Sequence, residues 1–393
     1  MIISLKTIAL LAPSFVTLFW AMILFVRNNS PRNPGFYIAS QMLAFFIVFT
    51  SIIPFYTGNV RLYLLLEPVF FFAVCMIFPL TWFYVRTVTC RTGLVRKDFI
   101  HFLPAVFITL SGIICQFLLP VEHLSYYGSG QPYPGGDSVT AQLPYLVNYF
   151  SKGIIVLQIP FYFVLSQGLI RRHRKQVDDY FSGLKHYYFN WIRIFYITYP
   201  GASILGLFLL LKGNSNLNST PDPILVLLFF LLSGIFFLIA YIANHQRYIE
   251  NGEFYRVMPG EEGIPIDAPH IPGGLKPALE QVFEEEQPYL QHELKITDIA
   301  SRLGTNRTYV SRLIRTHYDT NFSGFVNSFR AREAIRMLGQ EAYRNHTTKS
   351  IAESAGFNNY NSFTGAFRKE TGMTPGAYRE KINNSASKYP VQT

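Results

Sequence analysis

The chain has 393 residues, of which 50% are hydrophobic and only 15% are charged, and its formal net charge is +10. This composition excludes an ordinary soluble globular protein, because the apolar residues come in runs near the roughly 20 residues that a membrane helix needs. Residues 1–243 hold 16 basic and 7 acidic residues, hence +9, and residues 273–393 hold 16 and 12, hence +4. Charge alone therefore does not identify a DNA-binding protein.

Long apolar segments fill the first 243 residues. We predict seven transmembrane helices, at about 7–26, 36–56, 62–85, 99–119, 143–170, 191–211 and 223–243. Helices are expected because a bilayer offers no water to satisfy backbone groups, and the alternating pattern of a membrane β-barrel is absent. A signal peptide is an alternative for the first segment, but no small-residue cleavage site follows it. The expected fold is all-α, with a seven-helix transmembrane bundle over 1–243.

Basic residues gather in alternate loops between these segments. The first, third and fifth loops hold Arg27, Arg32, Arg86, Arg91, Arg96, Lys97, Arg171, Arg172, Arg174, Lys175 and Lys185. The other loops hold only Arg61 and Lys212. The positive-inside rule therefore predicts an N-terminus outside the cell and a C-terminal domain in the cytoplasm.

Several polar residues interrupt the apolar segments near the predicted outer side of the bundle. They are Glu67, Gln116, Asn148, Tyr149 and Lys152. Polar groups in a membrane cost free energy and often mark a functional site. We expect Glu67 and Lys152 to pair and the group to line a pocket for a small-molecule or peptide signal. The alternative is a purely structural polar pair.

A proline-containing stretch separates the apolar region from the rest of the chain. Residues 244–272 include Pro259, Pro265, Pro269 and Pro272, so we expect an extended juxtamembrane linker there. A folded domain is expected over 273–381, followed by a disordered tail over 382–393.

The C-terminal domain should consist of short amphipathic helices. The expected helices are 275–292, one after an N-cap at Thr297, then 306–317, 322–339, 350–355 and 360–371. Ala300 and Gly304 recur as Ala352 and Gly356, at the spacing of a buried helix residue and a tight turn. Each copy predicts a helix-turn-helix unit. The helix over 322–339 would hold the two units about 27 Å apart, near one turn of DNA.

The region from about 275 to 381 resembles the DNA-binding domain of the AraC/XylS family. The resemblance is carried by Ile351-Ala352-Glu353-Ser354-Ala355-Gly356-Phe357, Phe363, Phe367-Arg368-Lys369-Glu370-Thr371-Gly372, Thr374-Pro375 and Tyr378-Arg379. The whole arrangement resembles the membrane-embedded members of that family. The resemblance implies a transcription regulator in the bacterial cytoplasmic membrane that binds promoter DNA and contacts RNA polymerase and the lipid bilayer.

The resemblance also implies which residues lie at the DNA contact. In the first unit they are Asn306, Arg307, Thr308, Tyr309, Ser311 and Arg312, and in the second they are Asn359, Tyr360, Asn361, Ser362, Gly365, Arg368 and Lys369. Arg bonds guanine and Asn bonds adenine, whereas Arg368 and Lys369 suit phosphate. Gly365 departs from the family pattern, because it offers no side chain where one often contacts a base.

Other classes of function find little support in the sequence. No metal-ligand spacing, nucleotide-binding glycine loop, carboxylate pair or nucleophile–base arrangement occurs, so we expect neither an enzyme nor a cofactor. A membrane receptor or transporter whose helix-turn-helix tail binds another protein remains the alternative. The sequence leaves open whether the protein forms a homodimer.

Overall fold

The computed structural model of the protein describes residues 5–28, 30–90, 93–120, 124, 127, 139–182, 222–245 and 273–388. These residues form helices and no strand, which confirms the expected all-α class. The chain divides into two compact units. The first comprises Met1–Arg171 and Trp191–Tyr248, and the second comprises Arg172–Asn190 and Ile249–Thr393.

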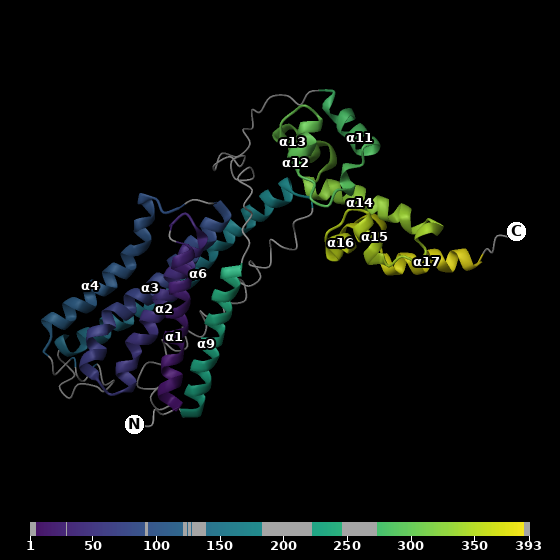
Figure 1. Ribbon diagram of the computed structural model, residues 1–393. Coiled ribbons are helices and arrows are strands. Elements are labelled where there is room, and N and C mark those ends of the chain that lie inside the picture. The colour runs from purple at the N-terminus through teal and green to yellow at the C-terminus, as the bar shows by residue number, and fades with distance from the viewer. Residues whose placement is uncertain are drawn as a thin grey trace. The chain divides into compact units, whose positions relative to one another are not determined.

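Long helices that pack side by side build the first unit (Figure 1). They are α1 (Leu5–Arg27), α2 (Pro34–Tyr56), α3 (Val60–Cys90), α4 (Leu103–Leu118), α6 (Val139–Tyr180, to Arg171 in this unit) and α9 (Asp222–His245), with the 3₁₀ helix η1 (Arg96–Phe102) before α4. Helix α1 packs against α2 and α9, α2 against α3, and α3 against α4.

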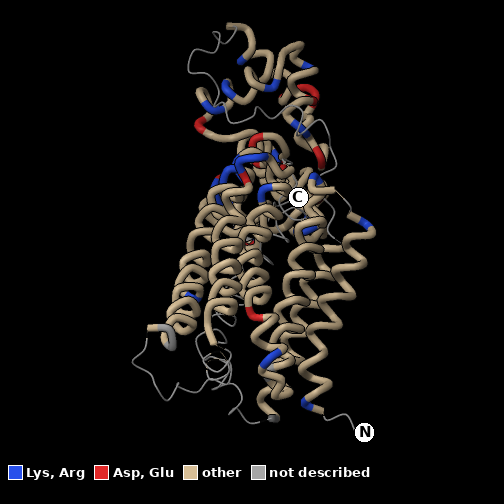
Figure 2. Tube along the Cα trace, turned by 90° about the vertical axis from the view of Figure 1, so that its left-hand side faces the viewer, with Lys and Arg blue, Asp and Glu red and all other residues tan. Residues whose placement is uncertain are grey.

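Six helices among the described residues are long and apolar enough to cross a membrane. The expected seventh span, 191–211, lies outside the described residues. Large apolar side chains point away from the unit, including Phe117 at 86%, Leu157 at 70% and Val164 at 66% exposure. An apolar surface of this kind suits contact with lipid, because its exposure to water would cost free energy. Lys and Arg gather at one end of these helices (Figure 2).

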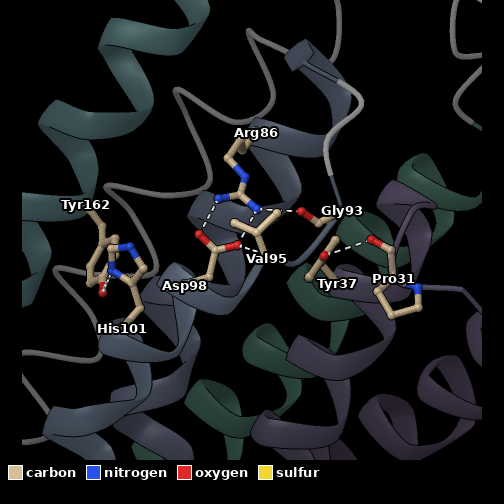
Figure 3. A network of polar contacts seen from close by, with 8 residues as sticks. All are labelled: Pro31, Tyr37, Arg86, Gly93, Val95, Asp98, His101 and Tyr162. Carbon is tan, nitrogen blue, oxygen red and sulfur yellow. Dashed lines mark hydrogen bonds and ion pairs between the residues drawn. The ribbon is translucent and has the colours of Figure 1, made fainter.

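One polar network at the start of η1 ties two helices together (Figure 3). The Arg86 guanidinium bonds both carboxylate oxygens of Asp98, at 2.6 and 2.7 Å, and the Gly93 carbonyl at 2.8 Å. Asp98 also accepts from the Val95 N–H at 2.7 Å. Arg86 therefore lies within α3, paired and largely buried, rather than free in the third loop. The prediction that the third loop is cytoplasmic therefore depends more on Arg96 and Lys97 than on Arg86.

Residues 273–388 of the second unit form seven α-helices. They are α11 (Leu275–Glu285), α12 (Ile296–Arg302), α13 (Arg307–Tyr318), α14 (Phe322–Leu338), α15 (Thr348–Ser354), α16 (Tyr360–Thr371) and α17 (Pro375–Lys388). Figure 1 shows α14 running between the α12–α13 pair and the α15–α16 pair. Each pair has its own hydrophobic core, and α14 contributes Phe325 and Val326 to the first core and Ala331 and Ala334 to the second.

The end of α6 is part of the first of these cores. Val177, Tyr180 and Phe181 are buried there with the helices of the first pair. Phe181 forms an antiparallel bridge with Lys295, and the Ser182 N–H donates to the Leu294 carbonyl at 3.1 Å. Residues 172–182, which we expected in the membrane domain, therefore belong with the C-terminal domain.

Three expected boundaries differ from the structure. Helix α11 ends at Glu285 instead of 292, because Gln287 has a left-handed φ of 48° and Pro288 follows it. Helix α12 begins at Ile296, so Thr297 is not its N-cap. Instead, the Asp298 carboxylate accepts from the Lys295 N–H at 2.9 Å. Helix α17 continues to Lys388 through a sequence without Gly or Pro after residue 376, whereas a disordered tail was expected from 382.

Replacing the two turn glycines should have unequal effects. Gly304 and Gly356 have φ of 60° and 90°, so alanine is strained at both, by about 1–2 kcal/mol. A Cβ at Gly304 would meet nothing within 4 Å, but at Gly356 it would overlap the Tyr289 carbonyl and lie 3.0 Å from the Arg330 Nε. We expect Gly356→Ala to cost about 3 kcal/mol or more.

Hydrogen exchange of the full chain in lipid nanodiscs measures this difference. Amide protection of α15 and α16 should fall much further in Gly356→Ala than protection of α12 and α13 falls in Gly304→Ala. Equal losses would show that the overlap at Gly356 is relieved without cost.

Candidate nucleic-acid interface

Two helix-turn-helix units repeat the same backbone geometry. In the first turn the Thr305 N–H donates to the Ala300 carbonyl at 2.9 Å, and in the second the Phe357 N–H donates to the Ala352 carbonyl at 2.9 Å. Ala300 and Ala352 are buried. The expected roles of these residues and of both turn glycines are therefore confirmed.

The second helix of each unit, α13 or α16, begins at an asparagine cap. The Asn306 side chain accepts from the Thr308 and Tyr309 N–H groups at 3.0 and 3.1 Å. Asn359 does the same for residues 361 and 362, at 2.7 and 3.1 Å. These bonds satisfy backbone donors that the first helical turn leaves free. Both asparagines were expected to contact DNA, and the structure gives each a capping role that explains its presence.

The polar face of α16 is open. Asn361, Gly365, Arg368 and Lys369 are exposed, and a Cβ built on Gly365 meets nothing within 4 Å. The Tyr360 hydroxyl lies 2.9 Å from the Thr348 hydroxyl, which links this helix to α15. Ser362 is partly buried near the cap. The lack of a side chain at Gly365 leaves Asn361, Arg368 and Lys369 as the exposed polar side chains of this set.

The corresponding face of α13 is more covered. Thr308 is exposed, whereas Arg307, Ser311 and Arg312 are partly buried. Tyr309 packs against the first core, and this packing explains an aromatic residue at position 309 without a DNA contact. Burial lowers the pKa of the Arg307 guanidinium below its ordinary value, and Tyr180 and Asp179 act in the opposite direction.

Arg315 is a further basic residue of α13, outside the set that was expected to contact DNA. Its guanidinium pairs with the Asp179 carboxylate, at the end of α6. Arg315 follows Ser311 by one helical turn, so it lies along the same face. This spacing was available in the sequence as a signal, but its acidic partner lies 136 positions away.

A buried arginine on α14 joins the parts of this domain. The Arg330 side chain is fully buried, and burial lowers its pKa to about 10, so it remains charged at neutral pH. It donates to the Tyr289 and Gln291 carbonyls at 2.6 Å each, and to the carbonyl and hydroxyl of Ser182 at 3.2 Å each. Phe357 lies beside it, with its ring centre 5.9 Å away.

The polar residues of the first unit form a smaller cluster than expected. The Tyr127 hydroxyl donates to the Glu67 carboxylate and accepts from the Asn148 amide at 2.8 Å. Gln116 instead bonds the Leu64 carbonyl, and the Lys152 ammonium lies 5.9 Å from the centre of the Tyr149 ring. No direct ion pair between Glu67 and Lys152 occurs among the described residues. Tyr127 was missed as a member because it lies 60 positions from Glu67 in a segment without an apolar pattern.

Comparisons with known proteins agree with this geometry. Residues 299–381 match the model of a family described as a helix-turn-helix domain. The chain is 33% identical over 91 residues to the HTH-type transcriptional regulator YtdP of Bacillus subtilis, covering 23% of this chain and 11% of that protein. It is 30% identical over 98 residues to the regulatory protein PocR of Salmonella typhimurium, covering 25% and 31%.

A third relative is the raffinose operon transcriptional regulatory protein RafR of Pediococcus pentosaceus. It is 28% identical over 122 residues, which cover 30% of this chain and 42% of that protein. The chain thus spans less than half the length of each of these relatives. No solved structure matches the chain. The C-terminal region is an AraC-type helix-turn-helix domain, as the sequence resemblance implied.

Substitutions at Asn306 separate its capping role from a DNA contact. Asn306→Ala removes the cap and should destabilise α13 by about 1 kcal/mol, whereas Asn306→Ser retains an accepting oxygen and should cost much less. Hydrogen exchange of α13 and DNA affinity of the full chain measure the two effects. A serine variant with normal α13 protection but greatly weakened DNA binding would contradict a role limited to capping.

Proposed function

We propose that this protein is a membrane-embedded transcription regulator of the bacterial cytoplasmic membrane. The observation that carries the proposal is the repeated helix-turn-helix geometry of residues 299–381, on the same chain as the six described helices that have membrane-spanning length and composition. In this proposal the helix-turn-helix domain lies in the cytoplasm, where promoter DNA and RNA polymerase are accessible.

The DNA contacts follow from the positions of α13 and α16. Helix α14 has 17 residues and is therefore about 25 Å long, which suits two helices that enter successive major grooves about 34 Å apart. Arg312 and Asn361 are proposed to contact base edges, because Arg and Asn bond guanine and adenine with two hydrogen bonds each. Arg368 and Lys369, at the end of α16, are proposed to contact phosphates.

The input is proposed to be a small-molecule or peptide signal at the Glu67 cluster. A carboxylate that bonds a tyrosine hydroxyl, which in turn bonds an amide, can exchange these partners for a ligand. A ligand that replaces the Tyr127 bond to Glu67 would separate Tyr127 from α3. A signal that favours one arrangement of the bundle shifts the equilibrium between states of the regulator.

Chromatin immunoprecipitation of the native protein tests the proposed DNA binding. We expect discrete peaks at promoters, and their loss in the Arg312→Ala, Asn361→Ala double variant, since each base contact is worth about 1–3 kcal/mol. The Lys276→Ala variant, which removes a charge on α11, serves as control and should retain the peaks. A wild-type protein with no peaks would favour a membrane protein whose helix-turn-helix domain binds another protein.

A promoter found in this way then serves as a reporter for the Glu67 cluster. Glu67→Ala and Lys152→Ala should each shift reporter output across growth conditions, at unchanged membrane level. Ser111→Ala, which removes a hydroxyl that donates to the Phe107 carbonyl of its own helix, is the matched control. Unchanged output in both variants would exclude the cluster from signalling.

A further inference from the structure

The two helix-turn-helix units provide an internal comparison of their second helices. Helices α13 and α16 each have 12 residues and an asparagine cap, and a shift of 53 positions superposes Asn306 on Asn359 and the buried Val310 on Phe363. The same shift places Arg315 at the position of Arg368. Two basic side chains thus occupy equivalent places near the ends of the two helices.

These two arginines have different surroundings. Arg368 is exposed, as a group that binds a DNA phosphate must be. Arg315 pairs with the Asp179 carboxylate at the end of α6. A carboxylate and a phosphate are similar ligands for a guanidinium, since both accept charge-assisted hydrogen bonds. Asp179 therefore occupies the place on α13 that a phosphate would take if the two units bound DNA alike.

The residues next to Asp179 form a fixed support, whereas the contact of Asp179 with Arg315 can be exchanged. The support is apolar, since Val177, Tyr180 and Phe181 are buried in the first core. Asp179 itself uses one oxygen for Arg315, while its other oxygen is buried without a hydrogen-bond partner among the described residues. A carboxylate with one unsatisfied buried oxygen is held less strongly than a fully bonded one. The pair can therefore open while the core stays intact.

We propose that the end of α6 is an intramolecular competitor of DNA, in which Asp179 holds Arg315 in place of a phosphate. The inference rests on the proposed DNA binding. In this arrangement α6, which begins in the apolar bundle, regulates the first helix-turn-helix unit directly. A change at the end of α6 that turns the Asp179 side chain away from Arg315, while Val177, Tyr180 and Phe181 stay in the core, frees Arg315 and raises the affinity of the domain for DNA.

The test uses the full chain in lipid nanodiscs and a random-sequence duplex of about 30 base pairs, because a phosphate contact does not depend on base sequence. Asp179→Asn should bind this duplex about fivefold to tenfold more tightly than wild type at 0.1 M salt. The slope of log affinity against log salt should steepen by about 0.9, the value for one added phosphate contact. Asp178→Asn removes the same charge one position earlier and should have a much smaller effect.

A double-mutant cycle with Arg315→Ala tests whether Asp179 affects DNA affinity through Arg315. Asp179→Asn should produce no gain beyond that of Asp178→Asn when Arg315 is absent. The proposal is overturned if Asp179→Asn binds no more tightly than Asp178→Asn, or if its gain persists without Arg315. A gain accompanied by lost amide protection in α12 and α13 would also overturn it, by showing a disrupted core. If wild type and every variant fail to bind the duplex, the proposed DNA binding fails instead.

Discussion

The C-terminal domain depends on one buried cation. Arg330 lies on α14 between the residues that this helix gives to the first core and those it gives to the second. All the oxygens that it bonds are uncharged, and they come from the segment after α11, from its own helix and from the end of α6. A buried charge without these partners would carry a large desolvation cost. The hydrogen bonds of the guanidinium therefore fix the positions of the segment after α11 and of the end of α6.

This constraint also fixes the second turn. Gly356 approaches the Tyr289 carbonyl and the Arg330 Nε so closely that a Cβ has no room, and Phe357 packs beside the same guanidinium. The first turn, at Gly304, has open space around it. The two units look alike in sequence, but of their two turns it is the second that packs closely against Tyr289 and Arg330. The relative orientation of the two units is therefore set around Arg330.

Sequence patterns predicted local features of the chain, above all in the C-terminal domain, and missed non-local contacts in both units. The helices expected at 306–317, 322–339 and 360–371 lie within one residue of α13, α14 and α16, because their apolar periodicity is strong. The expected end of the first helix failed because Pro288 and a left-handed Gln287 outweighed the periodicity. The bond between Tyr127 and Glu67, and the pair between Asp179 and Arg315, join residues far apart in sequence, where no periodic pattern indicates contact.

The docked end of α6 has a consequence for how this protein is made and used. Ribosomes synthesise Val177, Tyr180 and Phe181 almost a hundred residues before α11, so the first core cannot form completely until its later helices have been made. For the same reason, a fragment that begins after residue 272 lacks three buried side chains of the first core. The first core is therefore complete only while the C-terminal helices remain joined to the end of α6.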